Sequence, residues 1–207
     1  MSTAVSTRLK KKEDWPVVLD FKALARKMDA DDFFQFCRDN ADYRIERTRK
    51  GELVVMPPTG GDTGVSNFEL TGVFREWVKK DQGGKGFDSS TGFHLPDGAD
   101  RSPDLAWVKL ERWQSLTPEQ RGKFPPLCPD FVVEIRSKSD SLRDLQDKLE
   151  EYLENGVQLG WLLDPQERKV YVYRPAQSVE CLEDPATLSG EPLLKGFVLT
   201  LAEIWGE

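Results

Sequence analysis

Residues 102–108 read Ser-Pro-Asp-Leu-Ala-Trp-Val, and residues 129–136 read Pro-Asp-Phe-Val-Val-Glu-Ile-Arg. Each stretch predicts a short, buried strand that carries one carboxylate. Asp104 opens the first strand, and Glu134 lies inside the second. An ionised carboxylate in such a strand is costly to bury unless a cation, a hydrogen-bond donor or a metal ion accompanies it. The two acids therefore predict a shared polar site on neighbouring strands of a sheet.

The local position of each acid fits more than one role. Side chains alternate between the two faces of a strand, so Glu134 and Arg136 share a face, about 6–7 Å apart. A structural ion pair has the same spacing as a catalytic pair. Asp104 follows Pro103, which is tolerated at the start of a strand, but Asp is also common where a turn ends. The spacing alone leaves these alternatives open.

Residues 139–155 predict the clearest helix of the chain. Its apolar face is made up of Leu142, Leu145, Leu149, Tyr152 and Leu153. Lys148 lies about 40° beyond Tyr152, at the edge of that face. It lies away from the side that we expect to face solvent, which carries Asp144, Asp147 and Glu151. Lys148 is therefore placed either to extend out of the core or to reach over the sheet.

These residues together fit magnesium-assisted cleavage of a phosphodiester bond. Asp104, Glu134 and the Ile135 carbonyl offer the oxygen ligands that Mg²⁺ prefers. A magnesium ion there polarises the scissile phosphate and lowers the pKa of a water molecule. Lys148 is expected to orient that water or to offset charge in the transition state.

Glu46 is a candidate additional acid. It lies in a strand predicted over residues 43–47, which forms a hairpin with residues 52–56. Glu46 could equally pair with Arg44 or Arg47 at the surface, and the sequence leaves both roles open.

The pattern outside the site indicates a mixed sheet flanked by helices. Helices are predicted over residues 29–40, 66–80 and 139–155, and strands over residues 43–47, 52–56, 105–109, 131–136, 159–163 and 169–173. Residues 87–95 are predicted to form one or two further short strands. Prolines and glycines predict a loop over residues 57–64, and a polar excursion runs through residues 125 and 126. The closing segment, residues 196–205, is expected to pack on the core. This order of elements is typical of the α/β or α+β class.

The length and composition fit one globular domain. We expect residues 29–207 to form it and residues 1–28 to be a flexible tail. The polar, basic first 15 residues lack the apolar segment of a secretory signal. No window approaches the roughly 18 apolar residues of a membrane span. A cytoplasmic protein that is not bound to a membrane is therefore expected.

The cysteines and the histidine narrow the choice of metal. Cys37, Cys128 and Cys181 are far apart in the sequence and predict buried, reduced thiols. With His94 as the single histidine, a zinc site built from His and Cys is disfavoured. Any metal here is expected to be held by oxygen ligands, which favours Mg²⁺ or Mn²⁺.

The chain resembles the Uma-type family of restriction endonuclease-like proteins, within the PD-(D/E)XK nuclease superfamily. The resemblance runs from about residue 29 to residue 205. The segments that carry it are residues 45–47 (Ile-Glu-Arg), 56–61 (Met-Pro-Pro-Thr-Gly-Gly), 93–96 (Phe-His-Leu-Pro), 102–104 (Ser-Pro-Asp), 129–134 (Pro-Asp-Phe-Val-Val-Glu) and 160–165 (Gly-Trp-Leu-Leu-Asp-Pro). Each segment is short, and their joint presence in this order is what makes the likeness specific.

The resemblance implies a restriction endonuclease-like core, a divalent metal and hydrolysis of nucleic acid. The superfamily's two acids match Asp104 and Glu134. The lysine two residues beyond the second acid is replaced by Arg136, and the family's shifted lysine matches Lys148 on the following helix. Because arginine does not give up its proton near neutral pH, Arg136 is not a simple substitute for that lysine. Lys138 is a further candidate cation near the strand end.

Two hypotheses follow for function. The first is a metal-dependent endonuclease acting on DNA, whose catalytic residues are Asp104, Glu134 and Lys148, with Glu46 and Arg136. The second is an inactive nuclease-fold protein that acts as a nucleic-acid- or protein-binding accessory factor. The net charge of -7 argues against non-specific coating of nucleic acid and favours the second. Metal binding by Asp104 and Glu134 distinguishes the two hypotheses, because only the active nuclease requires it. A homodimer is expected if the protein cuts both strands of a duplex.

Overall fold

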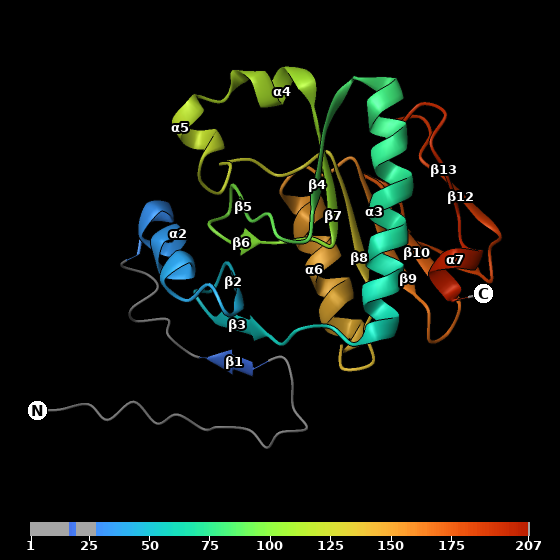
Figure 1. The fold of residues 1–207 in the computed structure, drawn as a ribbon, viewed down its shortest axis with the longest axis horizontal. Helices are drawn as coiled ribbons and strands as arrows, with labels where there is room; N and C mark the ends of the chain where they lie inside the picture. The colour runs from blue at the N-terminus through green and yellow to red at the C-terminus, as the bar shows by residue number, and fades with distance from the viewer. Residues whose placement is uncertain (1–16, 20–27, 207) are drawn as a thin grey trace, which may run out of the picture.

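The structure is a computed structural model that describes residues 17–19 and 28–206. Its centre is a six-stranded mixed sheet in the order β11-β10-β9-β8-β7-β4 (Figure 1). The strands are β4 (Gly84–Asp88), β7 (Leu105–Lys109), β8 (Phe131–Ile135), β9 (Leu159–Asp164), β10 (Lys169–Tyr173) and β11 (Glu180–Glu183). Only β8 and β9 pair in parallel; the other neighbours in this sheet are antiparallel.

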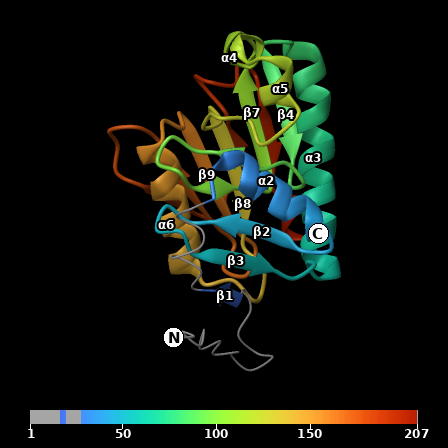
Figure 2. The ribbon, with the colours of Figure 1, turned by 90° about the vertical axis from the view of Figure 1, so that its left-hand side faces the viewer.

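Helices cover both faces of the central sheet. Figure 2 shows α3 (Gly61–Asp81) on one side and α6 (Leu142–Glu154) on the other. The α3 side holds the larger apolar cluster, in which Phe74, Phe131, Trp161 and Phe197 pack as aromatic pairs. The hairpin of β12 (Thr187–Ser189) and β13 (Val198–Thr200), followed by α7 (Ala202–Trp205), closes this side.

Helix α6 is the crossover between the parallel strands β8 and β9. It starts at Ser141, whose hydroxyl accepts a hydrogen bond from the Asp144 N–H, and ends at Asn155. Leu149 and Tyr152 bury its apolar face against the sheet. Gly160 allows the close approach, because a Cβ there would lie 2.8 Å from a methyl of Leu149. The helix is therefore held tightly over β8 and β9.

A second, antiparallel sheet stands beside one end of the central sheet (Figure 2). Its order is β1-β3-β2-β6-β5, formed by β1 (Val17–Leu19), β2 (Arg44–Arg47), β3 (Leu53–Met56), β5 (Phe93–His94) and β6 (Asp100–Arg101). Helix α2 (Ala30–Asp39) packs on it through Phe33, against Ile45 and Leu53. This sheet brings β2 and β6 towards the ends of β7 and β8.

The structure confirms the predicted fold class, a mixed sheet flanked by helices. It also confirms the helix at residues 29–40, which Asp29 caps by accepting a hydrogen bond from the Asp32 N–H at 2.9 Å. Trp77, Trp107, Trp113 and Trp161 lie in or against the apolar clusters, which makes them core residues.

Helix α3 corrects one boundary. It begins at Gly61 rather than at residue 66, because the extended backbone of Gly60 serves as its N-cap and the glycines are accommodated within the first turns. Phe68 is 76% exposed, although it is one of the apolar residues of this amphipathic helix. The longer helix turns Leu70 and Phe74 towards the sheet and Phe68 away from it.

Several short elements were not predicted. The excursion after β7 contains α4 (Leu110–Ser115) and α5 (Pro118–Arg121), the latter started by a capping box of Thr117 and Gln120. The strands β6, β11, β12 and β13 also lacked a signal, because they have two to four residues and few apolar side chains.

The terminal segment and the cysteines bear on two further predictions. Within the predicted tail, residues 17–19 form β1 along β3, while residues 1–16 and 20–27 lie outside the described residues. The single domain over residues 29–207 stays a proposal. All three cysteines are free thiols, as predicted, but the predicted burial is confirmed only for Cys128: Cys37 is half-buried and Cys181 is exposed. Among the described residues, no helix has the length and apolar character needed to cross a membrane.

Candidate active site

Asp104 and Glu134 lie side by side because their strands are antiparallel neighbours. Leu105 pairs with Val133 across β7 and β8, which places the residue before β7 next to the end of β8. One oxygen of Asp104, Oδ2, accepts a hydrogen bond from the Ile135 N–H at 2.8 Å. The other, Oδ1, lies 3.2 Å from a guanidinium nitrogen of Arg44 on β2. The structure thus brings the two predicted acids together.

Lys148 reaches the same place from α6. Its Nζ lies 2.7 Å from Glu134 Oε1 and 2.9 Å from Glu46 Oε1. The lysine side chain is only 9% exposed, so it does not extend into solvent. The Tyr152 hydroxyl, one helical turn later, also donates to Glu134 Oε1, at 3.3 Å. Lys148 therefore bridges one acid of the central sheet and one acid of the second sheet.

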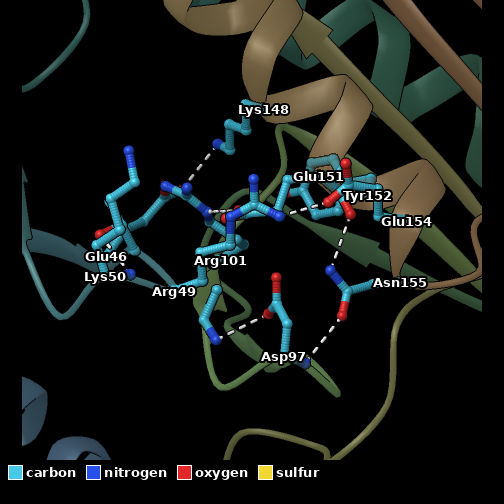
Figure 3. Close-up of polar contacts among 12 residues, drawn as sticks. Glu46, Arg49, Lys50, Asp97, Arg101, Lys148, Glu151, Tyr152, Glu154 and Asn155 are labelled. Carbon is cyan, nitrogen blue, oxygen red and sulfur yellow. Dashed lines mark hydrogen bonds and ion pairs between the residues drawn. The ribbon is translucent and has the colours of Figure 1, made fainter. Parts of the chain in front are cut away.

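Glu46 is buried at the centre of a polar network that links β2, β6 and α6 (Figure 3). Besides Lys148, its Oε1 accepts the Ser102 N–H at 3.0 Å, and its Oε2 accepts a hydrogen bond from Arg101 at 3.1 Å. Arg101 also donates through Nε to Glu151 at 2.5 Å. The alternative that Glu46 pairs with Arg44 or Arg47 at the surface is therefore wrong.

The sequence analysis placed Glu151 on the wrong side of its helix and did not identify Arg101. Glu151 was expected on the solvated side of its helix, but it is buried against Arg101. Arg101 sits in the two-residue strand β6, which has no apolar pattern to reveal it. A charged residue beside an apolar stripe gives the same sequence signal whether its partner is water or a buried ion.

The buried cluster contains more acids than cations. The acids are Glu46, Asp104, Glu134 and Glu151, and the cations are Arg44, Arg101 and Lys148. Four carboxylates against three cations leave a net charge of -1 when all are ionised. A surplus of buried negative charge is unfavourable in the chain alone and favours a bound cation.

The surplus of negative charge has its largest effect on the pKa of Glu134. Burial is the main cause that raises the pKa of Glu134; Lys148 opposes it, the neighbouring Asp104 and Glu46 add to it, and the net pKa is about 7. At Glu46, burial also acts to raise the pKa, but Lys148 and Arg101 outweigh it and hold that pKa at about 2. Glu46 is therefore a fixed anion, whereas Glu134 titrates near neutral pH.

Lys148 remains a cation in this setting. Burial acts to lower its pKa, but Glu134 and Glu46 outweigh that effect and raise it above the usual value. A lysine that keeps its proton cannot take one from water, so its contribution is electrostatic.

Two predicted cations lie outside this cluster. Arg136 donates to Asp164 on β9 at 2.7 Å and to the Asp140 carbonyl at 3.4 Å. Lys138 is exposed and pairs with Asp62 at the start of α3, at 3.0 Å. The structure brings neither residue to the acids by direct contact, although Lys138 lines the cavity beside them.

The cluster opens into a cavity of about 300 Å³. Arg44, Asp104, Glu134 and Lys148 are charged residues that line it, together with Ile135. Its rim consists of residues 56–63, from β3 into α3, and residues 137–140, between β8 and α6. Asp104 and Glu134 are thus buried yet accessible to a small ligand.

The donor set fits a magnesium or manganese ion. Within residues 17–19 and 28–206, no group of three or more His, Cys, Asp or Glu side chains is arranged to hold a metal. Magnesium commonly takes one or two protein carboxylates and fills its other positions with water and phosphate. Asp104 and Glu134 supply two carboxylates. His94 lies elsewhere, with Nδ1 2.9 Å from Asp100.

A family model described as "Uma2: Putative restriction endonuclease" matches residues 30–202 of the chain. The chain belongs to the Uma2 family. The expected resemblance is thereby confirmed, and it covers the whole buried cluster from Arg44 to Glu151.

A solved structure supports the same fold for this Uma2 member. It is the crystal structure of a "putative nuclease belonging to DUF820" from Anabaena variabilis ATCC 29413. The two chains superpose with a TM-score of 0.66 at 23% identity, over 78% of this chain and 89% of that one. No curated protein matches the chain. The likeness establishes the fold, and the chemistry has to be argued from the site.

Proposed function

We propose that this Uma2 protein is a divalent-metal-dependent endonuclease that hydrolyses phosphodiester bonds in DNA. The observation that carries the proposal is the buried cluster with its surplus carboxylate, open to a cavity. Membership of a nuclease family gives the reaction class.

Asp104, Glu134 and the Ile135 carbonyl are the ligands that we propose for Mg²⁺ or Mn²⁺. When bound, the ion polarises the scissile phosphate and lowers the pKa of a water molecule. Asp104 is already oriented for this role, since the Ile135 N–H fixes one of its oxygens. Glu134 gains most from the ion, because a cation relieves the unfavourable burial of its charge.

Lys148 and Arg44 are the groups that we propose for positioning the phosphate and the attacking water. An ammonium has three N–H donors, and the two acceptors that hold Lys148 leave one donor for substrate. Glu46 keeps Lys148 in place when Glu134 turns to the metal. Arg44 has a buried Nε without a partner among the described residues, so its guanidinium can still donate.

Glu46 and Arg136 take supporting roles in this proposal. Every polar contact of Glu46 is to a donor of the chain, so Glu46 acts by holding Lys148 and Arg101 rather than as a metal ligand. Arg136 ties β8 to β9 through Asp164. One chain carries the whole cluster, so the predicted homodimer is not needed to complete the site and stays a prediction.

The test is nicking of supercoiled plasmid in magnesium or manganese. We compare the parent with Glu134→Gln, and with Glu150→Gln as a control that removes an exposed carboxylate from α6, the helix that carries Lys148. The proposal expects metal-dependent nicking by the parent and the control, and loss of at least about 100-fold in Glu134→Gln. Equal cleavage by all three proteins contradicts the assignment.

The inactive accessory factor is the second candidate. It is favoured by the ion pairs that Arg44 and Lys148 already make with Asp104 and Glu134, which partly satisfy the acids without a metal. A folded parent that neither binds metal nor cuts DNA supports this alternative.

A further inference from the structure

A second cavity, of about 580 Å³, adjoins the first and has no role in the proposed chemistry. It lies between α2, β2, the turn after β4 and Phe124. The two cavities share Arg44 and residues 56–59 as a common wall. A ligand whose reacting group occupies the first cavity can therefore place its neighbouring group in the second.

The walls of the second cavity combine aromatic faces with polar groups. Tyr43 lines this cavity and is 57% exposed, so its ring is accessible to a ligand. Phe34 also lines the cavity and is fixed by an edge-on contact with Phe124, with ring centroids 5.2 Å apart. The guanidinium of Arg38 lies 5.9 Å from the centre of the Phe34 ring.

Residues with hydroxyl groups also line the second cavity. Ser89 and Ser90, in the turn after β4, line the cavity together with Thr59. Aromatic and guanidinium planes stack on the faces of nucleobases, and hydroxyls bond to their edges. This combination of walls fits a flat, polar-edged heterocycle better than an aliphatic group.

The acidic net charge of the chain also favours a binding site for a base. A net charge of -7 disfavours binding of nucleic acid through neutralisation of many phosphates. Stacking supplies roughly 1–3 kcal/mol per base and does not depend on net charge. A cavity for a base beside the phosphate site provides the binding energy that the acidic surface does not.

We propose that the second cavity receives an unpaired nucleobase of the DNA strand whose phosphate lies in the first cavity. In a duplex the bases are paired and stacked, so a base can enter only from a single strand or from a locally opened one. The preferred substrate is therefore single-stranded DNA. The site of cleavage in this inference rests on the proposed nuclease function, but the binding of the base does not.

The test measures binding without added divalent metal, so that cleavage cannot consume the probe. Fluorescence anisotropy of a labelled single-stranded oligonucleotide is compared with that of the same sequence as a duplex. The parent is expected to prefer the single strand. Tyr43→Ala is expected to weaken its binding by about 5- to 150-fold, as loss of one stacking contact predicts.

Phe68→Ala is the matched control, because it removes an exposed aromatic ring from α3 that does not line the second cavity. Binding by this variant should equal that of the parent, and Tyr43→Phe should retain it. Preference for the duplex, an equal effect of Tyr43→Ala and Phe68→Ala, or no binding to either probe overturns the inference. Failure of the nuclease proposal looks different: the single strand binds as expected but is not cut when magnesium is added.

Discussion

Glu134 is the residue on which the opposing effects in the site converge. It is buried in an apolar strand, attracted by Lys148 and repelled by two other carboxylates. Its usual pKa of 4.5 rises to about 7 in the folded chain. Between these values the folded state holds a proton that the unfolded state has lost. The contribution of Glu134 to the free energy of unfolding therefore falls as the pH rises from about 4.5 to about 7.

This pH dependence is measurable against Glu134→Gln, which cannot titrate. Urea unfolding at several pH values without metal should show the stability of the parent, relative to the variant, falling on the order of 1–3 kcal/mol across that window. A relative stability that stays flat or increases with pH is inconsistent with a raised pKa at Glu134.

Lys148 is expected to be a major contributor to stability as well as to the site. Replacing it with Met leaves Glu46 and Glu134 buried without their shared cation, which should cost about 3–5 kcal/mol of the free energy of unfolding. Lys138→Met is the control, because its pair with Asp62 is exposed and should be worth about 0–1 kcal/mol. Similar losses in both variants would argue against a buried bridge at Lys148.

At the scale of elements, the site depends on how α6 is tied to the second sheet. Arg101 on β6 contacts Glu151 on α6 and Glu46 on β2, so a single side chain connects three elements (Figure 3). This connection fixes the position of α6, and with it Lys148, over the acids of the central sheet.

A double-mutant cycle measures that connection. Arg101→Met alone leaves buried acids unpaired and should destabilise the protein by about 3–5 kcal/mol. Combining it with Glu151→Leu should cost less than the sum of the two single changes by about 1–3 kcal/mol, since the second change removes one of the unpaired charges. Additive losses, measured by urea unfolding, would show that Arg101 and Glu151 do not interact.

The elements also show what the sequence could and could not predict. Asp104 and Glu134 were predicted because an acid stands out in an apolar strand, and Lys148 because it borders an apolar helix face. Arg101 and Glu151 were not, since an acid or arginine among polar neighbours gives no such contrast. The start of α3 was misplaced because glycines that usually end helices here lie within its first turns. These features depend on contacts between residues far apart in the chain, and such contacts leave no local pattern in the sequence.

On the scale of the whole molecule, the site lies where two sheets meet. The second sheet contributes Arg44, Glu46 and Arg101, and the central sheet with α6 contributes Asp104, Glu134 and Lys148. The two cavities run along this junction and share a wall. A binding surface between two rigid sheets can hold a phosphate in one cavity and its base in the other.

The acidic charge of the molecule predicts a weak salt dependence of DNA binding. Few cations line the two cavities, chiefly Arg38, Arg44, Lys138 and Lys148. Each neutralised phosphate of a single strand contributes a slope of about -0.7 to log K against log salt, so we expect a total slope shallower than about -3. A slope near -6 in anisotropy titrations would instead indicate an extended phosphate-binding surface.

We propose that the surplus carboxylate of the buried cluster holds a bound cation. Isothermal titration calorimetry of the parent with Mn²⁺ tests this proposal directly. Glu134→Gln and Glu150→Gln are titrated in the same way. We predict saturable binding to the parent and to Glu150→Gln, and binding weakened by at least about tenfold in Glu134→Gln. Absence of saturable binding to the folded parent, or equal binding by all three proteins, would contradict the account.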